Sequence, residues 1–282
     1  MFPIIGMAIV FGSIVGGYLL EKGNIFVLVQ PSEFIIIVGA AVGSLFITCP
    51  PKLLFKIAKS MPSVLGGDKT GKKQYLNLLS LLYAIFSKMK KEGALGIEKD
   101  IESPEKSPMF AKYPDILKNH HAIASLCDNL RVLIVGVRPM ELEDMLTIES
   151  DTHHEEATVA PSAITKMADS LPGFGIVAAV LGVVITMGKM SEPPSVIGHS
   201  VAAALVGTFL GILLCYGFFG PIGSHLEHRA REEGKYLEAI KVAVLSFAKD
   251  VPPLMAVEAA RRVLFSDSRP SFKELENTVR KK

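Results

Sequence analysis

The stretches LPGFGIVAAVLGVVITMG (171–188) and VAAALVGTFLGILLCYGFFG (201–220) decide the fold, because neither contains an acidic or basic side chain. A helix rises about 1.5 Å per residue, so each stretch is long enough to cross a hydrocarbon core of about 30 Å. Two further apolar stretches, 2–20 and 34–49, extend the pattern. The stretch at 34–49 is short, and we expect flanking residues to lengthen it. The sequence therefore predicts four transmembrane helices.

Small residues recur at fourfold spacing in these stretches. Ala203, Gly207 and Gly211 form one row, and Gly175 stands four residues before Ala179. Because lipid is as apolar as leucine, membrane helices associate through close backbone approach, which small residues allow. We expect Gly175, Ala203, Gly207 and Gly211 to pack helix against helix. The other two predicted helices carry the same spacing at Gly12, Gly16, Gly39 and Gly43.

Basic residues predict the orientation of the chain. Of 30 Lys and Arg residues, 16 lie in 50–170 and 12 in 222–282, while the two short connections hold only Lys22 and Lys189. Cytoplasmic segments near membrane spans are enriched in Lys and Arg. We therefore expect both large segments and both termini in the cytoplasm. The N-terminal stretch lacks a basic start and a cleavage site, so we expect it to stay in the membrane.

The predicted fold class is an all-α membrane protein. It has four transmembrane helices, with a helical cytoplasmic domain inserted between spans two and three. The predicted segments are 1–49 (helices 1 and 2), 50–168 (the cytoplasmic domain), 169–221 (helices 3 and 4) and 222–282 (a cytoplasmic C-terminal helical segment).

Hydrophobic periodicity predicts the helices outside the membrane. The stretch QYLNLLSLLYAIFSKMKK (74–91) places on one helical face Leu78, Leu82, Ile85 and Met89. Gly93 then ends this helix. Further helices are expected over about 114–136, 139–158 and 222–249. Ser271 and Glu274 have the spacing of a capping box, which begins a short final helix.

Several classes of function are disfavoured by missing motifs. The chain has no Gly-rich phosphate loop, no GxSxG elbow and no paired-cysteine metal pattern. Its three cysteines are scattered, so no disulfide framework is expected. The net charge of +2 gives no basis for a nucleic-acid partner. We therefore expect neither an enzyme nor a resident cofactor.

The best candidate for a metal site is the run His153–Glu156 with His120 and His121. Adjacent histidines on a helix point about 100° apart and cannot easily share an ion. We therefore favour a solvated helix and predict no metal. The four spans also carry no Asp, Glu, Lys, Arg or His at depth, although an ion carrier needs such a group. If ions cross the membrane here, another chain is expected to supply the carboxylate.

The chain resembles the MotA family of flagellar motor stator proteins, and the resemblance is collinear over nearly its whole length. It is carried by QPSEFIIIVGAAVGSLF (30–46), IEKDIESP (97–104), PSAITKMADSLPGFGIVAAVLGVV (161–184), VAAALVGTFLGILLCYGF (201–218) and RPSFKELE (269–276).

This resemblance implies an assembly in the bacterial inner membrane that converts ion flow into torque on the rotor. A homo-oligomeric ring, expected to be a pentamer, would surround a dimer of a MotB-like partner. The partner's single membrane helix would bring an aspartate, and its periplasmic domain would bind peptidoglycan. The rotor protein FliG would be the second partner.

The resemblance also assigns roles to single residues. Pro172 and Pro221 match prolines that couple ion passage to movement, and Lys90 and Glu98 match charged residues that meet the rotor. The family often has Arg where Lys90 stands, so the charge is kept but the bidentate fork is lost, and Lys91 leaves the register open. The plain alternatives are a first-turn proline at Pro172, a helix-ending proline at Pro221, and a solvated face at Lys90 and Glu98.

Ion selectivity is expected to depend on two positions. Sodium-driven relatives place a Thr hydroxyl in each of the third and fourth spans, whereas this chain has Thr208 in the fourth span and Ala179 in the third. A methyl group offers no lone pair to a dehydrated cation, so we favour protons. A sodium-driven stator is the alternative. For Thr208, the alternative is a hydroxyl that only forms a hydrogen bond with the helix backbone and has no role with the ion.

A proton channel subunit of the TolQ and ExbB type is a second alternative. Such proteins share the packing logic, but they have three spans and a different loop arrangement. A polytopic membrane enzyme would require a convergent polar cluster, whereas a scaffold would require none. Four spans and paired prolines favour the stator.

Overall fold

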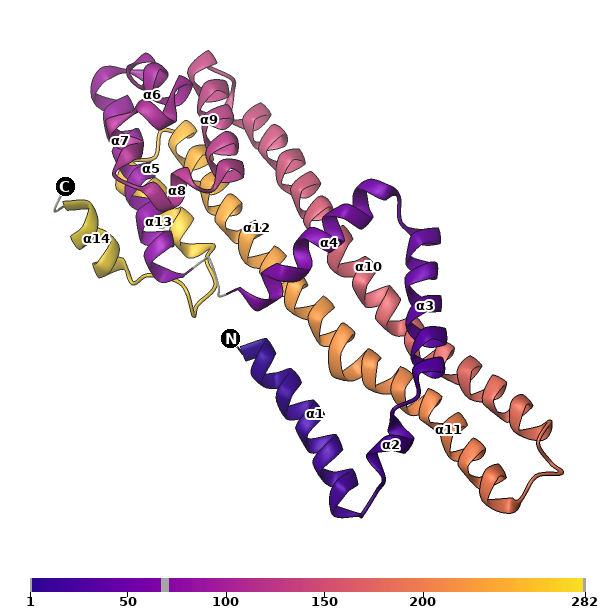
Figure 1. The fold of residues 1–282 in the computed structure, drawn as a ribbon. Helices are drawn as coiled ribbons and strands as arrows, with labels where there is room; N and C mark the ends of the chain where they lie inside the picture. The colour runs from indigo at the N-terminus through magenta and orange to yellow at the C-terminus, as the bar shows by residue number, and fades with distance from the viewer. Residues whose placement is uncertain (1, 67–70, 281–282) are drawn as a thin grey trace. The chain divides into compact units, whose positions relative to one another are not determined.

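The computed structural model describes residues 2–66 and 71–280, and every regular element among them is helical (Figure 1). The chain forms two compact units. Unit 1 comprises Met1–Gly67 and Glu156–His228, and unit 2 comprises Asp68–Glu155 and Arg229–Lys282. This division follows contacts between residues, whereas the segments expected from the sequence follow the membrane. The segment boundaries therefore stay a prediction.

Unit 1 contains the apolar helices. They are α1 (Phe2–Leu20), α2 (Ile25–Leu28), α3 (Pro31–Thr48), α4 (Pro51–Leu65), the C-terminal part of α10 (Pro139–Met187), α11 (Pro194–Ile212), the π-helical segment η3 (Leu213–Phe219) and the start of α12 (Gly220–Ala248). Four helical stretches among the described residues are long and apolar enough to cross a membrane, which confirms the four predicted spans. The short second span is lengthened by α2, because α2 and α3 together cover Ile25–Thr48.

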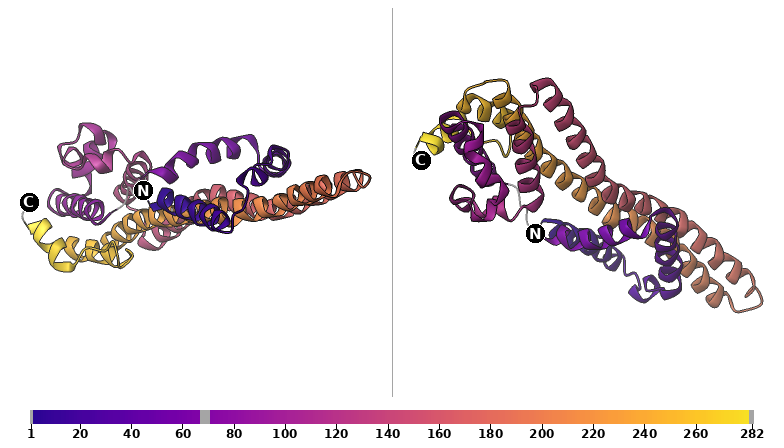
Figure 2. Two further views of the ribbon diagram at one scale, coloured as in Figure 1. Left: turned by 60° about the horizontal axis from the view of Figure 1, so that its bottom comes forward. Right: turned by 90° about the horizontal axis from the view of Figure 1, so that it is seen from above.

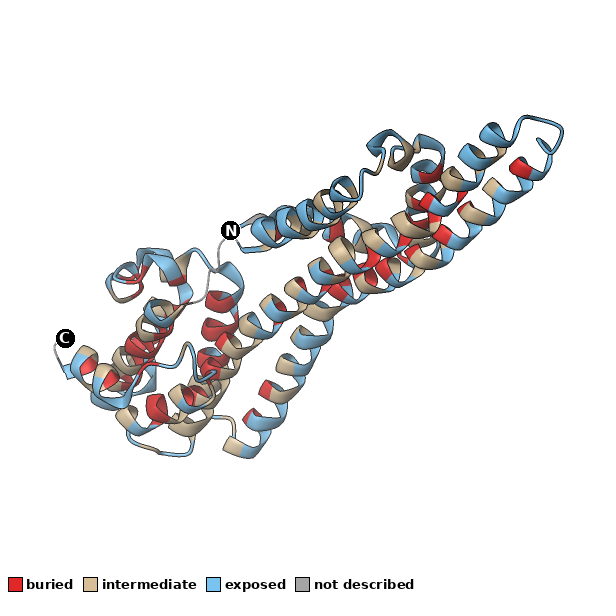
Figure 3. Cartoon of the chain, turned by 90° about the horizontal axis from the view of Figure 1, so that it is seen from below, coloured by how far each residue is buried: buried red, intermediate tan, exposed pale blue. Residues whose placement is uncertain are grey.

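The helices α10 and α11 form the central hairpin of unit 1. Figure 2 shows them running side by side to the turn at 188–193 in both views. The buried residues of unit 1 lie mainly along this pair and where α3 meets it (Figure 3). By contrast, no residue of α1 is buried, although this helix is strongly apolar. A helix that is hydrophobic all round and yet exposed is suited to lipid or to neighbouring chains.

The structure corrects the plain readings of both prolines. Pro172 is not a first-turn residue, because α10 runs without a break from Pro139 to Met187. Pro221 does not end a helix either, since α11, η3 and α12 follow one another directly. Proline removes one backbone hydrogen bond and crowds the carbonyl four residues earlier, which for Pro221 is Gly217. That carbonyl lies in η3, where the wider π-helical turn takes up the distortion.

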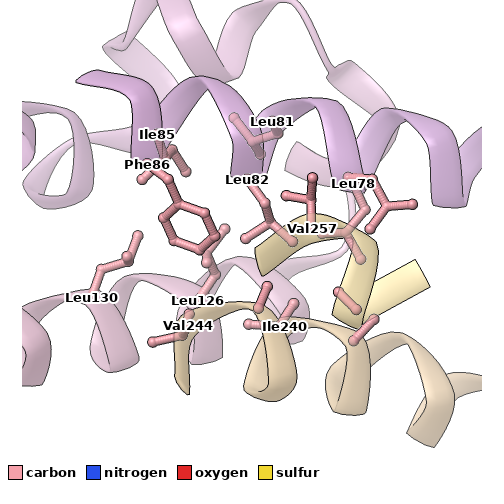
Figure 4. Packing of buried hydrophobic residues seen from close by; sticks show 14 of the residues in the cluster. Leu78, Leu81, Leu82, Ile85, Phe86, Leu126, Leu130, Ile240, Val244 and Val257 are labelled. Atoms are coloured by element: carbon pink, nitrogen blue, oxygen red, sulfur yellow. The ribbon is translucent and has the colours of Figure 1, made fainter. Parts of the chain in front are cut away.

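Unit 2 is a bundle of short helices packed on α5. Its elements are α5 (Lys72–Glu92), η1 (Ala94–Ile97), α6 (Glu98–Glu102), η2 (Pro104–Lys106), α7 (Pro108–Ala111), α8 (Pro114–Leu117), α9 (His120–Val135), the start of α10, the end of α12, α13 (Pro253–Arg262) and α14 (Phe272–Arg280). Figure 4 shows side chains of α5, α9, α12 and α13 meeting in one core. The predicted apolar face of α5 is confirmed, because all four of its residues are buried.

Local signals correctly predicted two helix ends of unit 2. Gly93 ends α5 with φ +81°, a left-handed conformation that glycine adopts without strain. The capping box is confirmed, because the Ser271 backbone N–H donates to the Glu274 carboxylate at 2.7 Å and the Glu274 N–H donates to Ser271 Oγ at 3.3 Å. Lys72 lies 2.8 Å from the same carboxylate, and these contacts, led by that of Lys72, lower the pKa of Glu274 to about 2.

Two predicted helices have different bounds in the structure. The helix expected over 114–136 is broken into α8 and α9, because Asn119 caps α9 by accepting a hydrogen bond from the Ala122 N–H at 3.2 Å. The helix expected over 139–158 is the beginning of the 49-residue α10. Pro161 lies inside α10 and does not end it.

Candidate functional site

The tightest backbone approach in unit 1 is between α10 and α11. A methyl carbon placed on Gly211 would lie 2.6 Å from the Leu171 carbonyl oxygen and 3.0 Å from Gly175 Cα. A methyl carbon on Gly175 would lie 2.8 Å from the Gly207 carbonyl oxygen. These gaps are too small for any side chain, so three of the residues singled out for packing lie at this contact. The fourth, Ala203, is half-buried, and its neighbour Ala204 instead faces Gly182, where an added methyl carbon would lie 2.6 Å from Ala204 Cβ.

The fourfold spacing of small residues in α1 and α3 does not lie at a helix contact within the described part of this chain. Four glycines of α1 and α3 have open space beside them, namely Gly12, Gly16, Gly39 and Gly43. A methyl carbon placed on any of them would have no atom of the described residues within 4 Å. Fourfold spacing of small residues therefore marks an intramolecular contact only in α10 and α11. In α1 and α3 it leaves smooth surfaces that face away from this chain's own core.

The structure brings Ala179 and Thr208 to the α10–α11 contact. A methyl carbon on Gly207 would lie 3.2 Å from the Ala179 backbone nitrogen, and one on Gly175 would lie 3.4 Å from Thr208 Cα. Both residues are half-buried. Among the described residues the Thr208 hydroxyl makes no hydrogen bond, whereas the hydroxyl of Thr186 donates to the Gly182 carbonyl at 2.8 Å. The Thr208 hydroxyl therefore keeps its donor and its lone pairs for another group.

Glu33 corrects the expectation that the spans hold no titratable group at depth. It stands in the first turn of α3 with only 6% of its surface exposed. One of its carboxylate oxygens, Oε2, has no hydrogen-bond partner and lies 2.6 Å from the place where a methyl carbon on Gly207 would be. Sequence reasoning missed this residue because an acidic side chain in a first helical turn normally reads as a partner of the helix dipole.

The charged residues assigned to the rotor lie around the Gly93 turn of unit 2. Lys90 is in the last turn of α5, and Glu98 begins α6. Both are exposed, and neither takes part in an ion pair within the described part of the chain. Their surroundings are held by a separate pair, because Lys88 Nζ lies 2.8 Å from Asp100 Oδ2. The Ser107 hydroxyl donates to the other oxygen of Asp100 at 2.5 Å.

The protonation of Asp100 is set by its surroundings. Burial alone would raise the pKa of this carboxyl, but hydrogen bonds from Lys88 and Ser107 outweigh burial and hold the pKa below its ordinary value of 3.8. The bond to Asp100 likewise raises the pKa of Lys88. The Asp100 side chain is 13% exposed, so this ion pair is screened only in part. It fixes α6 against α5 and thereby positions Lys90 and Glu98.

Two of the candidate metal-site histidines lie close together in the structure. The rings of His121 and His153 stack with their centroids 4.5 Å apart. They line an open cavity of about 460 Å³ in unit 2 with Gln74, Asp115, Lys118, Asn119, Glu233, Tyr236 and Leu237. No group of three or more His, Cys, Asp or Glu residues suited to a metal ion occurs in the described ranges.

Family models match two long segments of the chain. Residues 4–93 match the model described as Motility protein A N-terminal, and residues 117–239 match the MotA/TolQ/ExbB proton channel family. Motility protein A of Escherichia coli K12 is 40% identical over 99% of this chain and 95% of its own length. Chemotaxis protein LafT of Vibrio parahaemolyticus is 33% identical over 98% and 97%.

Solved structures share the fold. A chain of the C. jejuni MotAB structure superposes with a TM-score of 0.79 at 20% sequence identity, covering 95% of this chain and 98% of that one. The MotAB stator complex of Bacillus subtilis gives a TM-score of 0.71 at 23% identity, with coverage of 90% and 92%.

The close contact of α10 and α11 predicts that Gly211 tolerates no side chain. Replacing Gly211 by Leu should lower the stability of the purified chain by about 1–3 kcal/mol or more, because an overpacked helix pair must separate. Gly39→Leu is the matched control, since nothing lies near that glycine. Thermal unfolding in detergent measures the difference, and an equal effect of both variants would contradict this account of the contact.

The Lys88–Asp100 pair predicts a pH-dependent loss of stability. Asp100→Asn should lower the free energy of unfolding by about 1–3 kcal/mol at pH 7. Because the folded pKa is depressed, the native carboxylate stabilises the fold above pH 3.8, and this contribution is lost as the pH falls through the folded pKa.

Thermal unfolding of both proteins from pH 7 to pH 3 should therefore show a difference that shrinks in acid. Asp144→Asn is the control, because Asp144 is exposed. A difference that is the same at every pH would show that Asp100 acts by packing alone.

Proposed function

The chain belongs to the motility protein A family and is a stator subunit of the bacterial flagellar motor, and we propose that it conducts protons together with a MotB-like chain. The full-length match to motility proteins favours this function over a TolQ or ExbB type of channel. Proton flow through this complex turns the rotor. The chain needs no resident cofactor for this task, since the ion itself is the cargo.

The observation that carries proton conduction is the setting of Thr208. Its hydroxyl has no partner among the described residues, and Thr208 belongs to the close contact of α10 with α11, where its Cα approaches Gly175 and the preceding Gly207 approaches Ala179. A partner aspartate and water can use this hydroxyl as a hydrogen-bond donor or acceptor. Sodium needs several oxygen ligands at once to replace its hydration shell, and the methyl group of Ala179 contributes none. The combination of Thr208 and Ala179 therefore suits protons better than sodium.

The proposed assembly is a ring of these chains, a pentamer, around a dimer of the MotB-like partner. Support comes from the apolar surfaces that the chain leaves uncovered, since α1 has no buried residue and the glycines of α3 face open space. Such surfaces fit neighbouring subunits and lipid. The partner's membrane aspartate would complete the ion path.

The proposed orientation puts both termini and the large polar segments in the cytoplasm. The cytoplasmic domain then lies between spans two and three, and the connections near Lys22 and Lys189 lie outside. The distribution of basic residues supports this orientation. It would place the exposed charges Lys90 and Glu98 on the same side as the rotor protein FliG.

Pro172 and Pro221 are proposed to couple proton transfer to movement. Each interrupts the hydrogen-bond ladder of a helix that continues beyond it, in α10 and at the start of α12. A proline within a continuous helix is a place where the helix bends at low cost. A change at the ion path would thus alter the course of both helices without breaking them.

Proton specificity predicts the ion dependence of flux. Vesicles holding this chain with a MotB-like partner should conduct protons without sodium, and flux should stop when the partner's membrane Asp is changed to Asn, because the path loses its acceptor. Fluorescence of a trapped pH dye measures flux across a sodium series at fixed membrane potential. A steep requirement for sodium would exclude the proton reading.

The rotor-facing charges predict an asymmetry between neutralisation and reversal. Lys90→Ala and Glu98→Gln should retain most swarming, because exposed pairs contribute only about 0–1 kcal/mol each. Lys90→Glu and Glu98→Lys should lose it, because attraction becomes repulsion, and reversed charges on FliG should restore it.

Swarm diameters at matched expression test this expectation. Lys112→Glu, at an exposed lysine elsewhere in unit 2, is the control. Normal swarming of the Lys90 and Glu98 reversal variants would identify both residues as an ordinary solvated surface.

A further inference from the structure

Two carboxylates are deeply buried among the described residues, and of these two Glu258 is paired. Glu258 is 3% exposed and accepts hydrogen bonds from Arg261 at 2.6 Å and from Arg262 at 2.8 Å. Glu33 is 6% exposed, and its Oε2 has no partner among the described residues. Buried polar atoms are nearly always satisfied, so an orphaned carboxylate oxygen needs an explanation.

The position of Glu33 along α11 places it within the span. The carboxylate meets α11 at Gly207, which stands 13 residues after the first residue of that helix, Pro194. At 1.5 Å per residue this is roughly 20 Å from the first residue of α11 and roughly 9 Å past Val201, where the stretch without charged side chains begins. Glu33 therefore contacts the uncharged part of α11, although it begins α3. It lies beside the same short stretch of α11 that carries Thr208.

The wall of this site consists of small residues. Gly207 leaves the space that the carboxylate fills, and Ala178 Cβ and the Ala179 backbone nitrogen lie 3.1 Å and 3.2 Å from the place where a Gly207 side chain would start. Any methyl group on Gly207 would therefore collide with the carboxylate. The glycine that lets α10 approach α11 also makes room for Glu33.

Charged groups on the elements around Glu33 lie away from it along the helices. On α11 the titratable residue is His199, eight residues and more than two turns before Gly207. On the membrane part of α10 they are Lys166 and Asp169, nine or more residues before Ala178, and α2 has none. The lysines of α4 follow the far end of α3, at Lys52, Lys56 and Lys59. Glu21 and Lys22 precede α2, and none of these charged groups forms an ion pair with Glu33 in the described part of the chain. An unpaired buried carboxylate is costly to keep charged.

We propose that Glu33 is a second proton-binding carboxyl of the ion path, working beside the one that the partner chain supplies. This inference rests on the proposed proton conduction. The carboxylate takes a proton from water that enters between the helices, and the O–H bond formed makes the site neutral. The proton then passes to the partner carboxylate, directly or through water, and Glu33 returns to its ionised form. No other bond changes.

Proton flux in vesicles holding the full chain with its MotB-like partner tests this proposal. Glu33→Gln keeps the size and polarity of the side chain but cannot titrate, so flux at pH 7 should fall on the order of tenfold and one ionisation should vanish from its pH profile. Glu33→Asp should restore that ionisation with a shifted midpoint. Glu192→Gln is the control, because Glu192 is an exposed carboxylate of the 188–193 turn.

A second measurement uses the unaltered complex and so does not depend on how variants fold. Dicyclohexylcarbodiimide is an apolar reagent that modifies protonated carboxylic acids in apolar sites, and mass spectrometry locates the adduct. We expect an adduct on Glu33 that increases as the pH falls and that lowers flux in parallel.

The outcomes separate this inference from the proposed function. Failure of the unaltered complex to conduct protons would refute proton conduction itself. An unaltered complex that conducts, with Glu33→Gln giving the same flux and pH profile, would overturn the role of Glu33 alone. So would the absence of any adduct on Glu33 in a complex that conducts protons.

Discussion

The close approach of α10 and α11 is the constraint on which the membrane part of this molecule depends. Lipid does not drive two apolar helices together, so their association relies on close packing, and here Gly175 and Gly211 bring backbone against backbone. The contact fixes the rotation of both helices about their axes. That rotation decides which side chains meet between the two helices, and it brings Thr208 and Ala179 to this contact.

The same constraint explains how a carboxylate comes to be buried in the span. A helix contact made by glycine leaves space on the outer side of that glycine, and at Gly207 the space is filled by Glu33 from α3. Elsewhere in the chain a buried carboxylate is held by arginines, as Glu258 is by Arg261 and Arg262. A buried carboxylate paired with arginines is held in its charged form, whereas an unpaired one keeps its capacity to exchange a proton.

Sequence patterns predicted the features that depend on neighbours along the chain. The four spans, the stop at Gly93 and the Ser271–Glu274 capping box are of this kind, because length, backbone conformation and cap geometry are local. The burial of Glu33 was missed because it depends on α11, which lies far away in sequence. The path of the helix through Pro172 was also missed, since a first-turn proline and a proline inside a long helix have the same local sequence.

The positions of the two prolines matter because the helices do not stop there. In α10, Pro161 and Pro172 both lack an N–H, so two hydrogen bonds are missing from one 49-residue helix. At the start of α12, Pro221 also removes one backbone hydrogen bond. It follows the π-helical segment η3, where the pattern of backbone hydrogen bonds is already irregular. Each helix is therefore regular along most of its length and weaker near its prolines. In the proposed mechanism, protonation of a carboxyl in the span would remove a charge from an apolar site, and a small bend at Pro172 or Pro221 would be carried along a helix that continues beyond it.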